Sequence, residues 1–460
     1  MFVGREKELQ ILNKQYESGN FEFTVLYGRR RIGKTQLLKE FIKDKNSIYY
    51  MAIEAGYNTN LNLLSKNIYS NTEKSSYLSP FPDFNQLFNY ISDISKDRRL
   101  VLIIDEYPYL AQSAPEISSI IQNFCDHEWK NTKLHLVLCG SSMSFMENQV
   151  LGIKSPLYGR RTAQIKLKSF TYFETEKYLY PMQKEDIAIL HYATGGIAEY
   201  LTYIDTNVSL KENLISLFLK DSGRLYEEPI NFLKQELREP NVYHNILNAI
   251  ANGSTKNNTI ATKINIQSGA LNRYLDNLIE LGIIIKEFPV NEDSTRKSIY
   301  RIADGSFKFW YQFVLPNMSA IELGLGENVY NESIKDYLNS YMGEGFEKIF
   351  YDYFDKLNQE GKLPALFTKR GRWWGNNPNL KREEEIDLIG ISKTITLFAE
   401  VKWNKDPIDL KIAQSLIEKS LLLKPKKAFY ILFSKNGFTE SVQRLSREED
   451  NIELISFLDY

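Results

Sequence analysis

The chain has 460 residues, a formal net charge of −1, and 43% hydrophobic and 13% aromatic residues. This composition excludes a disordered protein, because there is enough apolar material to build packed cores. The balanced charge excludes a global cationic field that would attract nucleic acid or an anionic membrane, so any DNA contact must be local. The length indicates about three domains of ~100 to 200 residues each.

The two cysteines, Cys125 and Cys139, cannot form a disulfide framework or a four-ligand zinc site. No apolar signal segment follows Met1, and no apolar run approaches the ~18 residues needed to span a bilayer. We therefore expect a cytoplasmic protein without a membrane partner.

The chain begins with FVGREKE at residues 2–8, just before a helical pattern of apolar residues. A turn at Gly4 and Arg5 could close over an adenine or could start the first helix. Spacing alone does not choose between these two roles.

Residues 28–35 read GRRRIGKT and fit the phosphate-loop pattern G-x-x-x-x-G-K-[ST] at every position. A β-prone segment, 23–27, precedes the loop and a helix-favouring segment, 36–41, follows it. Glycines let consecutive backbone N–H groups face an anion, and the following helix points its positive end there. The alternative, a glycine turn in a basic loop, does not account for this context.

The phosphate loop therefore predicts ATP as a ligand, with Lys34 reaching the β- and γ-phosphates and the Thr35 hydroxyl holding Mg²⁺. We assign nucleotide binding to the whole loop and to the residue after it: Gly28, Arg29, Arg30, Arg31, Ile32, Gly33, Lys34, Thr35 and Gln36.

Residues 101–104 are four apolar residues followed by Asp105 and Glu106. They predict a strand whose carboxyl end delivers two acids to the edge where α/β sheets bind ligands. Asp105 would hold the Mg²⁺ and Glu106 would polarise the attacking water, because phosphoryl transfer depends on positioning and charge neutralisation. Two acids after a strand also fit a helix cap, but the upstream phosphate loop favours the catalytic pair.

A further predicted strand, 133–139, ends in a glycine and two serines. Ser141 is our candidate for sensing the γ-phosphate, with Ser142 as the alternate. Before the next predicted strand, we assign Arg160, with Arg161 beside it, as an arginine finger that could reach the phosphates of a neighbouring subunit, so a homo-oligomer is possible. The alternative is a solvated pair of arginines. The helical region that follows, with a glycine turn at 194–201, suits a lid over the nucleotide.

These segments, FVGRE, GRRRIGKT, LIIDEYPYL, CGSS, SPLYGRR and TGGIAEYL in that order, resemble the archaeal-type ATPase family of the AAA+ and STAND-related group. The resemblance covers about the first half of the chain. It implies a P-loop core with a helical lid. It also implies that Lys34, Thr35, Asp105 and Glu106 have the roles of the matching residues of the family.

The middle of the chain reads as helix, helix, helix and hairpin, which is the order of a winged helix. The helices are expected at 242–251, 259–264 and 268–281, and the two β-rich runs at 283–288 and 298–302. The third helix would read DNA. It carries one arginine, Arg273, beside one aspartate and one glutamate, which is few cations for phosphate contacts. Packing on the ATPase is the alternative role.

Near the C-terminus, Glu347 lies on a predicted helix, Asp387 in one β-prone run, and Glu400 and Lys402 on the next. Glu400 and Lys402 are two residues apart, so they point to the same face of their strand. Two acids and a lysine on adjacent strands can bind a divalent metal and orient a water for phosphodiester cleavage. We assign Asp387, Glu400 and Lys402 as catalytic, and Glu347, Asp387 and Glu400 as ligands of Mg²⁺ or Mn²⁺.

This pattern resembles the PD-(D/E)xK nuclease fold. The segments RGRWWG, EEEIDLIG and AEVKW also resemble the C-terminal domain of unknown function that follows the ATPase in the archaeal-type family. Ile386 precedes Asp387 where the fold's name expects a proline. Gln414 falls where some members place a further polar residue. An inactive nuclease-like fold and a strand pair with surface charges are the alternatives.

The predicted fold class is α/β: a P-loop NTPase parallel sheet with a helical lid, then a winged helix, then a small α/β nuclease-like domain. The predicted boundaries are 1–168 for the core, 169–235 for the lid, 236–305 for the winged helix, 306–340 for a linker and 341–460 for the nuclease-like domain. This organisation predicts an ATP-hydrolysing switch coupled to a metal-dependent domain that acts on DNA. The alternative is a non-cutting ATP-dependent regulator, or a DNA-binding protein with an inactive nuclease fold.

Overall fold

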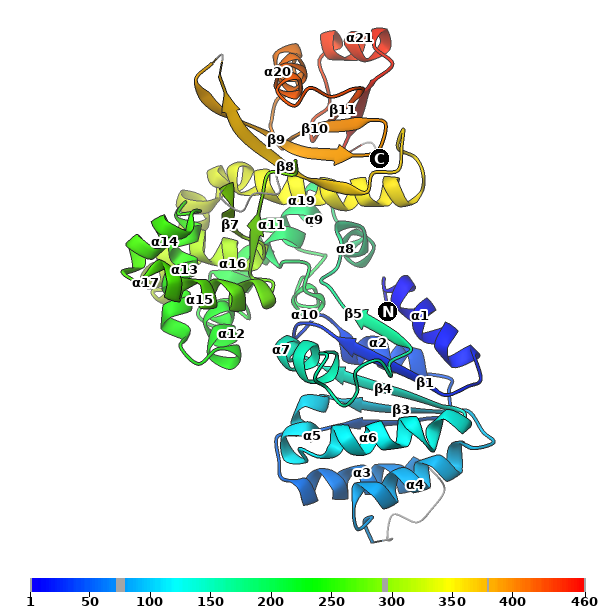
Figure 1. Ribbon diagram of the computed structural model, residues 1–460. Coiled ribbons are helices and arrows are strands. Elements are labelled where there is room, and N and C mark those ends of the chain that lie inside the picture. The colour runs from blue at the N-terminus through cyan, green and yellow to red at the C-terminus, as the bar shows by residue number, and fades with distance from the viewer. Residues whose placement is uncertain (1, 72–78, 292–296, 379, 459–460) are drawn as a thin grey trace. The chain divides into compact units, whose positions relative to one another are not determined.

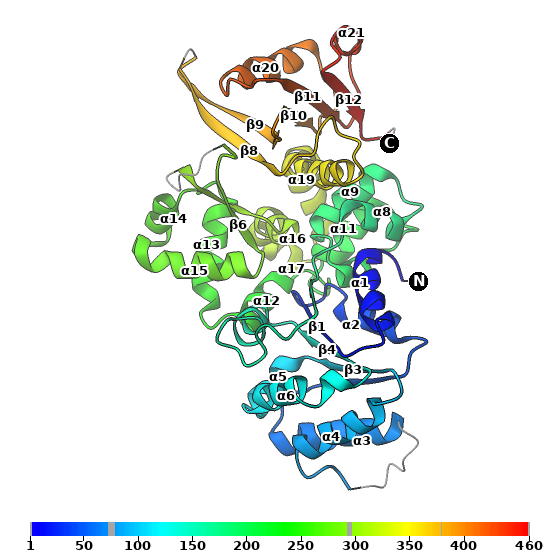
Figure 2. The same cartoon turned by 45° about the vertical axis from the view of Figure 1, so that its right-hand side comes forward.

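The computed structural model describes residues 2–71, 79–291, 297–378 and 380–458. The chain divides into two compact units, which are described separately (Figures 1 and 2). Unit 1 comprises Met1–Phe170 and Ile197–Glu199, and unit 2 comprises Thr171–Gly196 and Tyr200–Tyr460. In the described part of the chain, no helix has the length and apolar character needed to cross a membrane.

Unit 1 is built on a five-stranded sheet of order β2-β3-β4-β1-β5, in which every neighbouring pair is parallel. Its strands are β1 (Glu22–Tyr27), β2 (Ser47–Met51), β3 (Leu100–Asp105), β4 (Leu134–Gly140) and β5 (Ala163–Lys166). β3 and β4 are buried along their whole length, as expected for central strands covered on both faces.

Two apolar clusters cover the two faces of this sheet. One packs α1 (Glu6–Glu17) and α2 (Lys34–Ile42) through residues such as Leu12 and Leu37. The other packs the helices from α3 onward through residues such as Leu64, Phe88 and Ile121. These helices are α3 (Tyr57–Asn71), α4 (Phe84–Ser95), α5 (Tyr107–Ser113) and α6 (Ile117–Asp126), followed by the short turns Trp129–Asn131, α7 (Met143–Phe145) and Met146–Val150.

Unit 2 begins with the helices predicted as a lid: α8 (Tyr172–Leu179), α9 (Lys184–Ala193), α11 (Leu210–Phe218) and α12 (Glu228–Glu236). The short helix α10 (Ala198–Leu201) spans the point where the chain passes between the units. Next come α13 (Pro240–Ala251), α14 (Asn257–Ile264) and α15 (Ser268–Glu280), and then the antiparallel pair β6 (Ile284–Glu287) and β7 (Ile299–Ile302). This is the helix, helix, helix, hairpin order that the sequence predicts.

The region predicted as a linker, 306–340, is mostly helical, and most of its aromatic side chains are buried. It contains α16 (Gly305–Phe309), Trp310–Val314, Leu315–Asn317, α17 (Met318–Glu322), α18 (Gly326–Val329), Tyr330–Ile334 and Lys335–Tyr337. Phe309 contacts Phe218 and Tyr341, with ring centroids 4.6 and 5.5 Å apart. Trp310 donates its indole N–H to the Tyr226 carbonyl. The aromatic side chains therefore form a helical core in place of an extended connection.

The C-terminal part has a second five-stranded sheet, of order β12-β11-β10-β9-β8. β9 is antiparallel to both of its neighbours, β8 and β10, while β10, β11 and β12 run parallel. Helix α19 crosses one face of the sheet, and α20 and α21 lie on the other (Figures 1 and 2). The bounds are α19 (Leu338–Gln359), β8 (Lys369–Asn377), β9 (Arg382–Ile391), β10 (Thr396–Lys402), α20 (Leu410–Leu421), β11 (Ala428–Ser434), α21 (Glu440–Glu448) and β12 (Ile452–Ser456).

Candidate functional sites

The phosphate loop joins β1 to α2 and depends on its two glycines. Gly28 lies so close to the next strand that an added Cβ would be 2.4 Å from the Leu167 carbonyl oxygen. Gly33, with φ 92°, is in the left-handed region just before the first turn of α2. Only glycine adopts both positions without strain, so these residues fix the path of the loop.

Lys34 is 6% exposed, and its ammonium donates hydrogen bonds to the carbonyls of Gly28 and Arg29, both at 2.9 Å. These bonds hold the charge against the loop. Ile32 is buried in the apolar cluster below the loop, and the Arg30 guanidinium lies 3.4 Å from the Tyr109 hydroxyl. Gln36 is exposed on the first turn of α2.

Asp105, at the carboxyl end of β3, is 1% exposed and accepts three hydrogen bonds. Its Oδ2 accepts from the Thr35 hydroxyl at 2.9 Å and from the Tyr49 hydroxyl, and its Oδ1 accepts from the Glu106 N–H at 2.9 Å. Burial and the charge of Asp105 raise the pKa of Tyr49, so this phenol stays protonated and donates. A hydroxyl and a carboxylate in contact are the oxygen ligands that Mg²⁺ prefers.

Glu106 and Ser141 are in direct contact. Glu106 Oε2 accepts a hydrogen bond from the Ser141 hydroxyl at 2.8 Å and one from its backbone N–H at 3.2 Å. The Glu106 backbone is left-handed, with φ 51° and ψ 44°, a conformation that glutamate rarely adopts. The structure therefore brings the predicted catalytic acid and the predicted phosphate sensor together at one edge of the sheet.

Arg160 is held within its own chain. Its guanidinium makes a bidentate pair with Asp126 at the end of α6, with distances of 2.8 and 2.6 Å, and also donates to the Pro156 carbonyl. Hydrogen bonding to Arg160 lowers the pKa of Asp126. The arginine-finger role of Arg160 stays a prediction, and it would require this pair to open.

Two contacts on the phosphate loop were not predicted from the sequence. Arg5, which is 4% exposed, donates to the Ile32 carbonyl at 3.0 Å and to the Lys168 carbonyl at 2.7 Å. Glu199 donates its backbone N–H to the Arg31 carbonyl at 3.0 Å, and its carboxylate lies 3.7 Å from the Arg31 guanidinium. The arginine in FVGRE and the acid in TGGIAEYL were the sequence signals for these contacts, but neither motif indicates which residue its side chain will contact.

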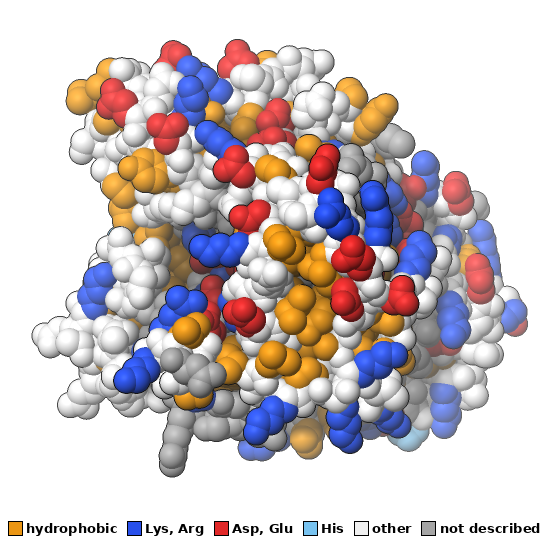
Figure 3. All heavy atoms as spheres, turned by 90° about the horizontal axis from the view of Figure 1, so that it is seen from above, with side chains coloured by type: hydrophobic (Ala, Val, Ile, Leu, Met, Phe, Trp, Pro, Cys, Tyr) orange, Lys and Arg blue, Asp and Glu red, His pale blue; other side chains and the backbone are white. Residues whose placement is uncertain are grey.

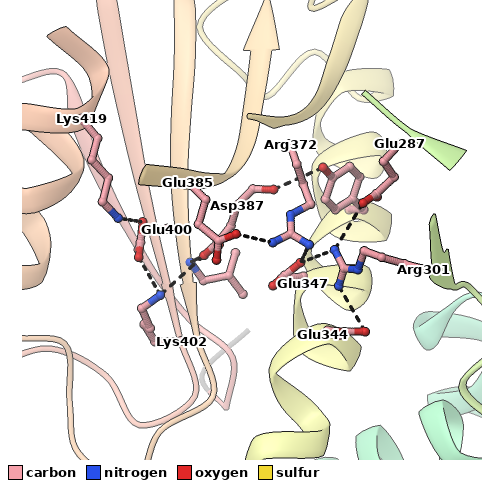
Figure 4. A network of polar contacts seen from close by, with 12 residues as sticks. Glu287, Arg301, Glu344, Glu347, Arg372, Glu385, Asp387, Glu400, Lys402 and Lys419 are labelled. Carbon is pink, nitrogen blue, oxygen red and sulfur yellow. Dashed lines mark hydrogen bonds and ion pairs between the residues drawn. The ribbon is translucent and has the colours of Figure 1, made fainter. Parts of the chain in front are cut away.

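The second site lies on β9 and β10, where Asp387, Glu400 and Lys402 meet as the sequence predicts (Figure 4). Lys402 Nζ is 2.6 Å from Glu400 Oε1 and 3.6 Å from Asp387 Oδ2. Asp387 Oδ2 also accepts the Val401 N–H at 2.8 Å, and Lys419 of α20 lies 3.5 Å from Glu400. Gln414, on the same helix as Lys419, is exposed.

Charge and burial compete at this second site. Burial, and then the charge of Asp387, raise the pKa of Glu400. Burial lowers the pKa of Lys402, but Asp387 and Glu400 outweigh it and the net shift is upward, so this lysine stays charged. Glu400 Oε2 is buried and accepts no hydrogen bond. That oxygen lies 3.5 Å from Lys419 Nζ, so a hard divalent cation bound by the two carboxylates would have to displace this lysine to use it.

Glu347, the third predicted metal ligand, is engaged elsewhere. It lies on α19, 3.8 Å from Arg301 and 3.5 Å from Arg372. Burial, and then the charge of Asp387, raise the pKa of Glu347. Among the residues that the structure describes, no three histidine, cysteine or acidic side chains converge as a ready metal-binding group. The metal set of Glu347, Asp387 and Glu400 therefore stays a prediction.

Comparison with known proteins identifies the two ends of the chain. Residues 2–204 match an ATPase domain found predominantly in Archaea, and residues 310–415 match archaeal and bacterial proteins of unknown function. The chain is 36% identical over 437 residues to the uncharacterized protein MJECL04 of Methanocaldococcus jannaschii, a match that covers 92% of each protein. It is also 44% identical over 45 residues to the uncharacterized ATP-binding protein MJ0423 of the same organism, covering 10% of this chain and 76% of the relative.

The chain therefore belongs to the same family as MJECL04, and it carries an archaeal-type ATPase domain followed by a C-terminal domain of unknown function. Among solved structures it resembles the Walker-type ATPase paby2304 of Pyrococcus abyssi, with a TM-score of 0.53 and 21% identity. That match covers 67% of this chain and 96% of the other, and it shows the fold alone. The predicted α/β fold class and the archaeal-type ATPase resemblance are confirmed.

Proposed function

We propose that this protein is a magnesium-dependent ATPase that acts as a nucleotide switch. The observation that carries the proposal is the contact between Thr35 and Asp105, 2.9 Å, beside the pair Glu106 and Ser141 at the same edge of the parallel sheet. This contact joins the phosphate loop to the two acids after β3. This arrangement supports the proposed roles of these side chains in phosphoryl transfer.

In this mechanism the loop N–H groups and Lys34 bind the β- and γ-phosphates. Thr35 and Asp105 would hold Mg²⁺, which when bound neutralises charge on the phosphates. Glu106 orients the attacking water and accepts its proton, and it must first leave Ser141. Ser141, once released, can donate its hydroxyl to the γ-phosphate.

The switch is carried by the glycine turn within the predicted lid, where the chain passes between the two units. Glu199 belongs to unit 1, where it binds Arg31 of the phosphate loop. Gly195 and Gly196, both left-handed, belong to unit 2. A Cβ on Gly195 would lie 2.7 Å from Asp304 Oδ1, so this turn is tightly packed within unit 2. We propose that a change of the loop on ATP binding or hydrolysis is passed along this continuous stretch of chain.

The test of the ATPase uses two substitutions with opposite outcomes. We expect Lys34→Ala to abolish tight ATP binding, because the loop loses the cation that reaches the phosphates. We expect Glu106→Gln to bind ATP and to stop turnover. Lys39→Ala, exposed on the same helix, is the control and should match the wild type in both assays. Wild-type turnover in Glu106→Gln would remove Glu106 from the mechanism.

A second function is favoured by the geometry of unit 2. Helix α19 precedes three antiparallel strands, of which β9 and β10 bring Asp387, Glu400 and Lys402 together, as the PD-(D/E)xK resemblance implies. We propose a metal-dependent nuclease-like site here. Asp387 and Glu400 would hold Mg²⁺ or Mn²⁺, which supplies charge neutralisation at a phosphodiester, and Lys402 would orient a water.

We propose DNA as the substrate class, with α13, α14, α15 and the β6–β7 hairpin acting as a winged helix. The cations available for it are dispersed. Arg273 on α15 is 74% exposed and lies 3.4 Å from Glu239. Figure 3 shows lysine and arginine side chains interspersed with acidic ones on the face it displays. A surface on which cations are dispersed among acids favours weak, salt-sensitive contact with DNA over tight non-specific binding.

The nuclease-like site is tested by Mn²⁺ titration in a nucleotide-free Lys34→Ala background, which keeps the ATP site out of the measurement. We expect Asp387→Ala to remove the binding, because a hard cation loses one of its carboxylate ligands. We expect Lys402→Ala to keep the binding and to lose cleavage of DNA. Asp406→Ala, exposed just after β10, is the control. If the wild-type C-terminal site neither binds Mn²⁺ nor cuts DNA, the nuclease-like function is excluded and the alternative of a non-cutting, ATP-dependent regulator remains.

A further inference from the structure

An arginine of the β6–β7 hairpin contacts the helix that carries Glu347. Arg301 of β7 is 15% exposed and lies 3.4 Å from Glu287 of β6, across the hairpin. It also lies 3.2 Å from Glu344 and 3.8 Å from Glu347, which are three residues apart and so share one face of α19. Figure 4 shows the guanidinium between these acids.

Glu347 is approached by a second cation from the strand β8. Arg372 lies 3.5 Å from Glu347 and 3.0 Å from Glu385. Glu344 has its own second cation, since Lys308 lies 2.5 Å from it. The charge of Glu347 is therefore shared by one guanidinium from β8 and one from the hairpin.

The hairpin is anchored to the C-terminal sheet by more than charge. Val290, just after β6, donates its N–H to the Arg372 carbonyl at 2.9 Å. Its side chain is 5% exposed and packs in the apolar cluster of the sheet with Trp373 and Ile386. A Cβ on Gly371 would lie 3.3 Å from the Val290 side chain, so the glycine permits this close approach.

A cleft of about 470 Å³ opens at this junction. Acids and bases line it together: Arg301, Lys308, Glu344, Glu347, Arg372 and Glu385. A cation that enters it meets the positive charge of Arg301 before it can share Glu347. A carboxylate with two cations within 4 Å has little charge left for a third, and like charges in one partly buried cleft repel.

We propose that Arg301 is an internal counter-cation that competes with a divalent metal for Glu347. The docked hairpin then weakens metal binding at the nuclease-like site, and withdrawal of the hairpin removes one of the two guanidinium groups that pair with Glu347, leaving Arg372. The proposal rests on the nuclease-like site proposed above and adds its regulation. It also gives the hairpin a function in autoinhibition, apart from any contact with DNA.

The first test measures Mn²⁺ affinity in the nucleotide-free Lys34→Ala background. We expect Arg301→Ala to raise the affinity on the order of tenfold, the size of a typical coupling between two ligands. Arg273→Ala removes an exposed arginine that is also paired with a glutamate, and it should leave the affinity unchanged. Adding Asp387→Ala to Arg301→Ala should abolish the binding, which assigns the titrated metal to this site.

The second test uses hydrogen exchange and keeps Arg301, so it does not depend on how well the Arg301 variant folds. Coupling is reciprocal, so a metal that competes with Arg301 must weaken the docking of the hairpin. We expect saturating Mn²⁺ to speed exchange of the Val290 amide, whose partner is the Arg372 carbonyl. The amides of β12, at the opposite edge of the sheet from β8, should be unchanged.

The outcomes separate the two proposals. Mn²⁺ binding that Asp387→Ala removes, but that Arg301→Ala leaves within twofold, would overturn the counter-cation and keep the metal site. The same holds if Mn²⁺ leaves exchange at Val290 unchanged. Absence of Mn²⁺ binding in both the parent and Arg301→Ala would overturn both proposals, and the arginine would be a structural joint between the hairpin and α19.

Discussion

Replacement of Arg5 by alanine tests whether the phosphate loop depends on a residue far from the nucleotide. Arg5 is 4% exposed and joins two separate parts of unit 1. Its guanidinium donates to the Ile32 carbonyl inside the loop and to the Lys168 carbonyl after β5, and it lies 4.6 Å from the centre of the Phe170 ring. The substitution removes these contacts, together with the 3.8 Å ion pair between Arg5 and Glu8, and leaves both carbonyls to find other partners.

The magnitude follows from these contacts. A hydrogen bond from a charged donor contributes about 1.5 to 3 kcal/mol, and a buried group left without a partner costs about 1 to 3 kcal/mol. The Lys168 bond is partly exposed, so water can replace it, and we count the Ile32 bond in full. Together with the aromatic contact we expect Arg5→Ala to destabilise unit 1 by about 3 kcal/mol and to weaken ATP binding.

Hydrogen exchange of the buried amides in β1 and β4 reports on the opening of unit 1 alone. A loss of about 3 kcal/mol should speed their exchange about 100-fold, since 1.4 kcal/mol is a factor of ten. Arg98→Ala, an exposed arginine in the same unit, is the control and should change exchange little. Exchange rates in Arg5→Ala within twofold of the wild type would refute the reasoning.

Three further outcomes are expected. Burial raises the pKa of Asp352 to about 6, and its carboxylate accepts the Tyr172 N–H. Between about pH 4 and about pH 6 the Asp352 carboxyl is therefore protonated more in the folded state than in the unfolded state, so unit 2 loses stability as pH rises through this range. Asp352→Asn should remove this pH dependence and raise the free energy of unfolding at pH 7 by about 2 to 3 kcal/mol, measured by chemical unfolding. If Arg160 acts on the nucleotide of a neighbouring subunit, ATPase turnover per subunit should rise with protein concentration, and Asp126→Ala should raise this turnover further. Turnover that does not change on dilution would give the Arg160–Asp126 pair a structural role. Ser141→Ala should lower kcat with little change in ATP affinity, checked by steady-state kinetics and titration.

The position of the candidate ATP site could be predicted from the sequence, while the roles of its single residues stay predictions. A phosphate loop can be recognised from contiguous residues, because its glycines and Lys34 lie within one short loop of the chain. Asp105 and Glu106 follow a fully apolar strand, and the carboxyl ends of parallel strands meet at one edge. Such local rules do not depend on how the rest of the chain folds.

The linker prediction shows where such rules end. Residues 306–340 have no strong periodicity, yet most of their aromatic side chains are buried among helices of unit 2, as Phe309 is against Phe218. The richness in aromatic residues was the signal, since a solvated linker has no use for them. Which helices would bury them depended on packing across unit 2.

The sequence by itself determined the chemistry that each half can attempt: ATP binding at residues 28–36, and a carboxylate and lysine cluster at Asp387, Glu400 and Lys402. Only the tertiary structure decided the partners. Arg5 meets Lys168 across 163 positions of sequence, and Arg301 meets Glu347 through the docking of a hairpin on another sheet. Partner choice between charges far apart in the chain follows from which surfaces pack together. A charge pattern read along the chain does not contain that information.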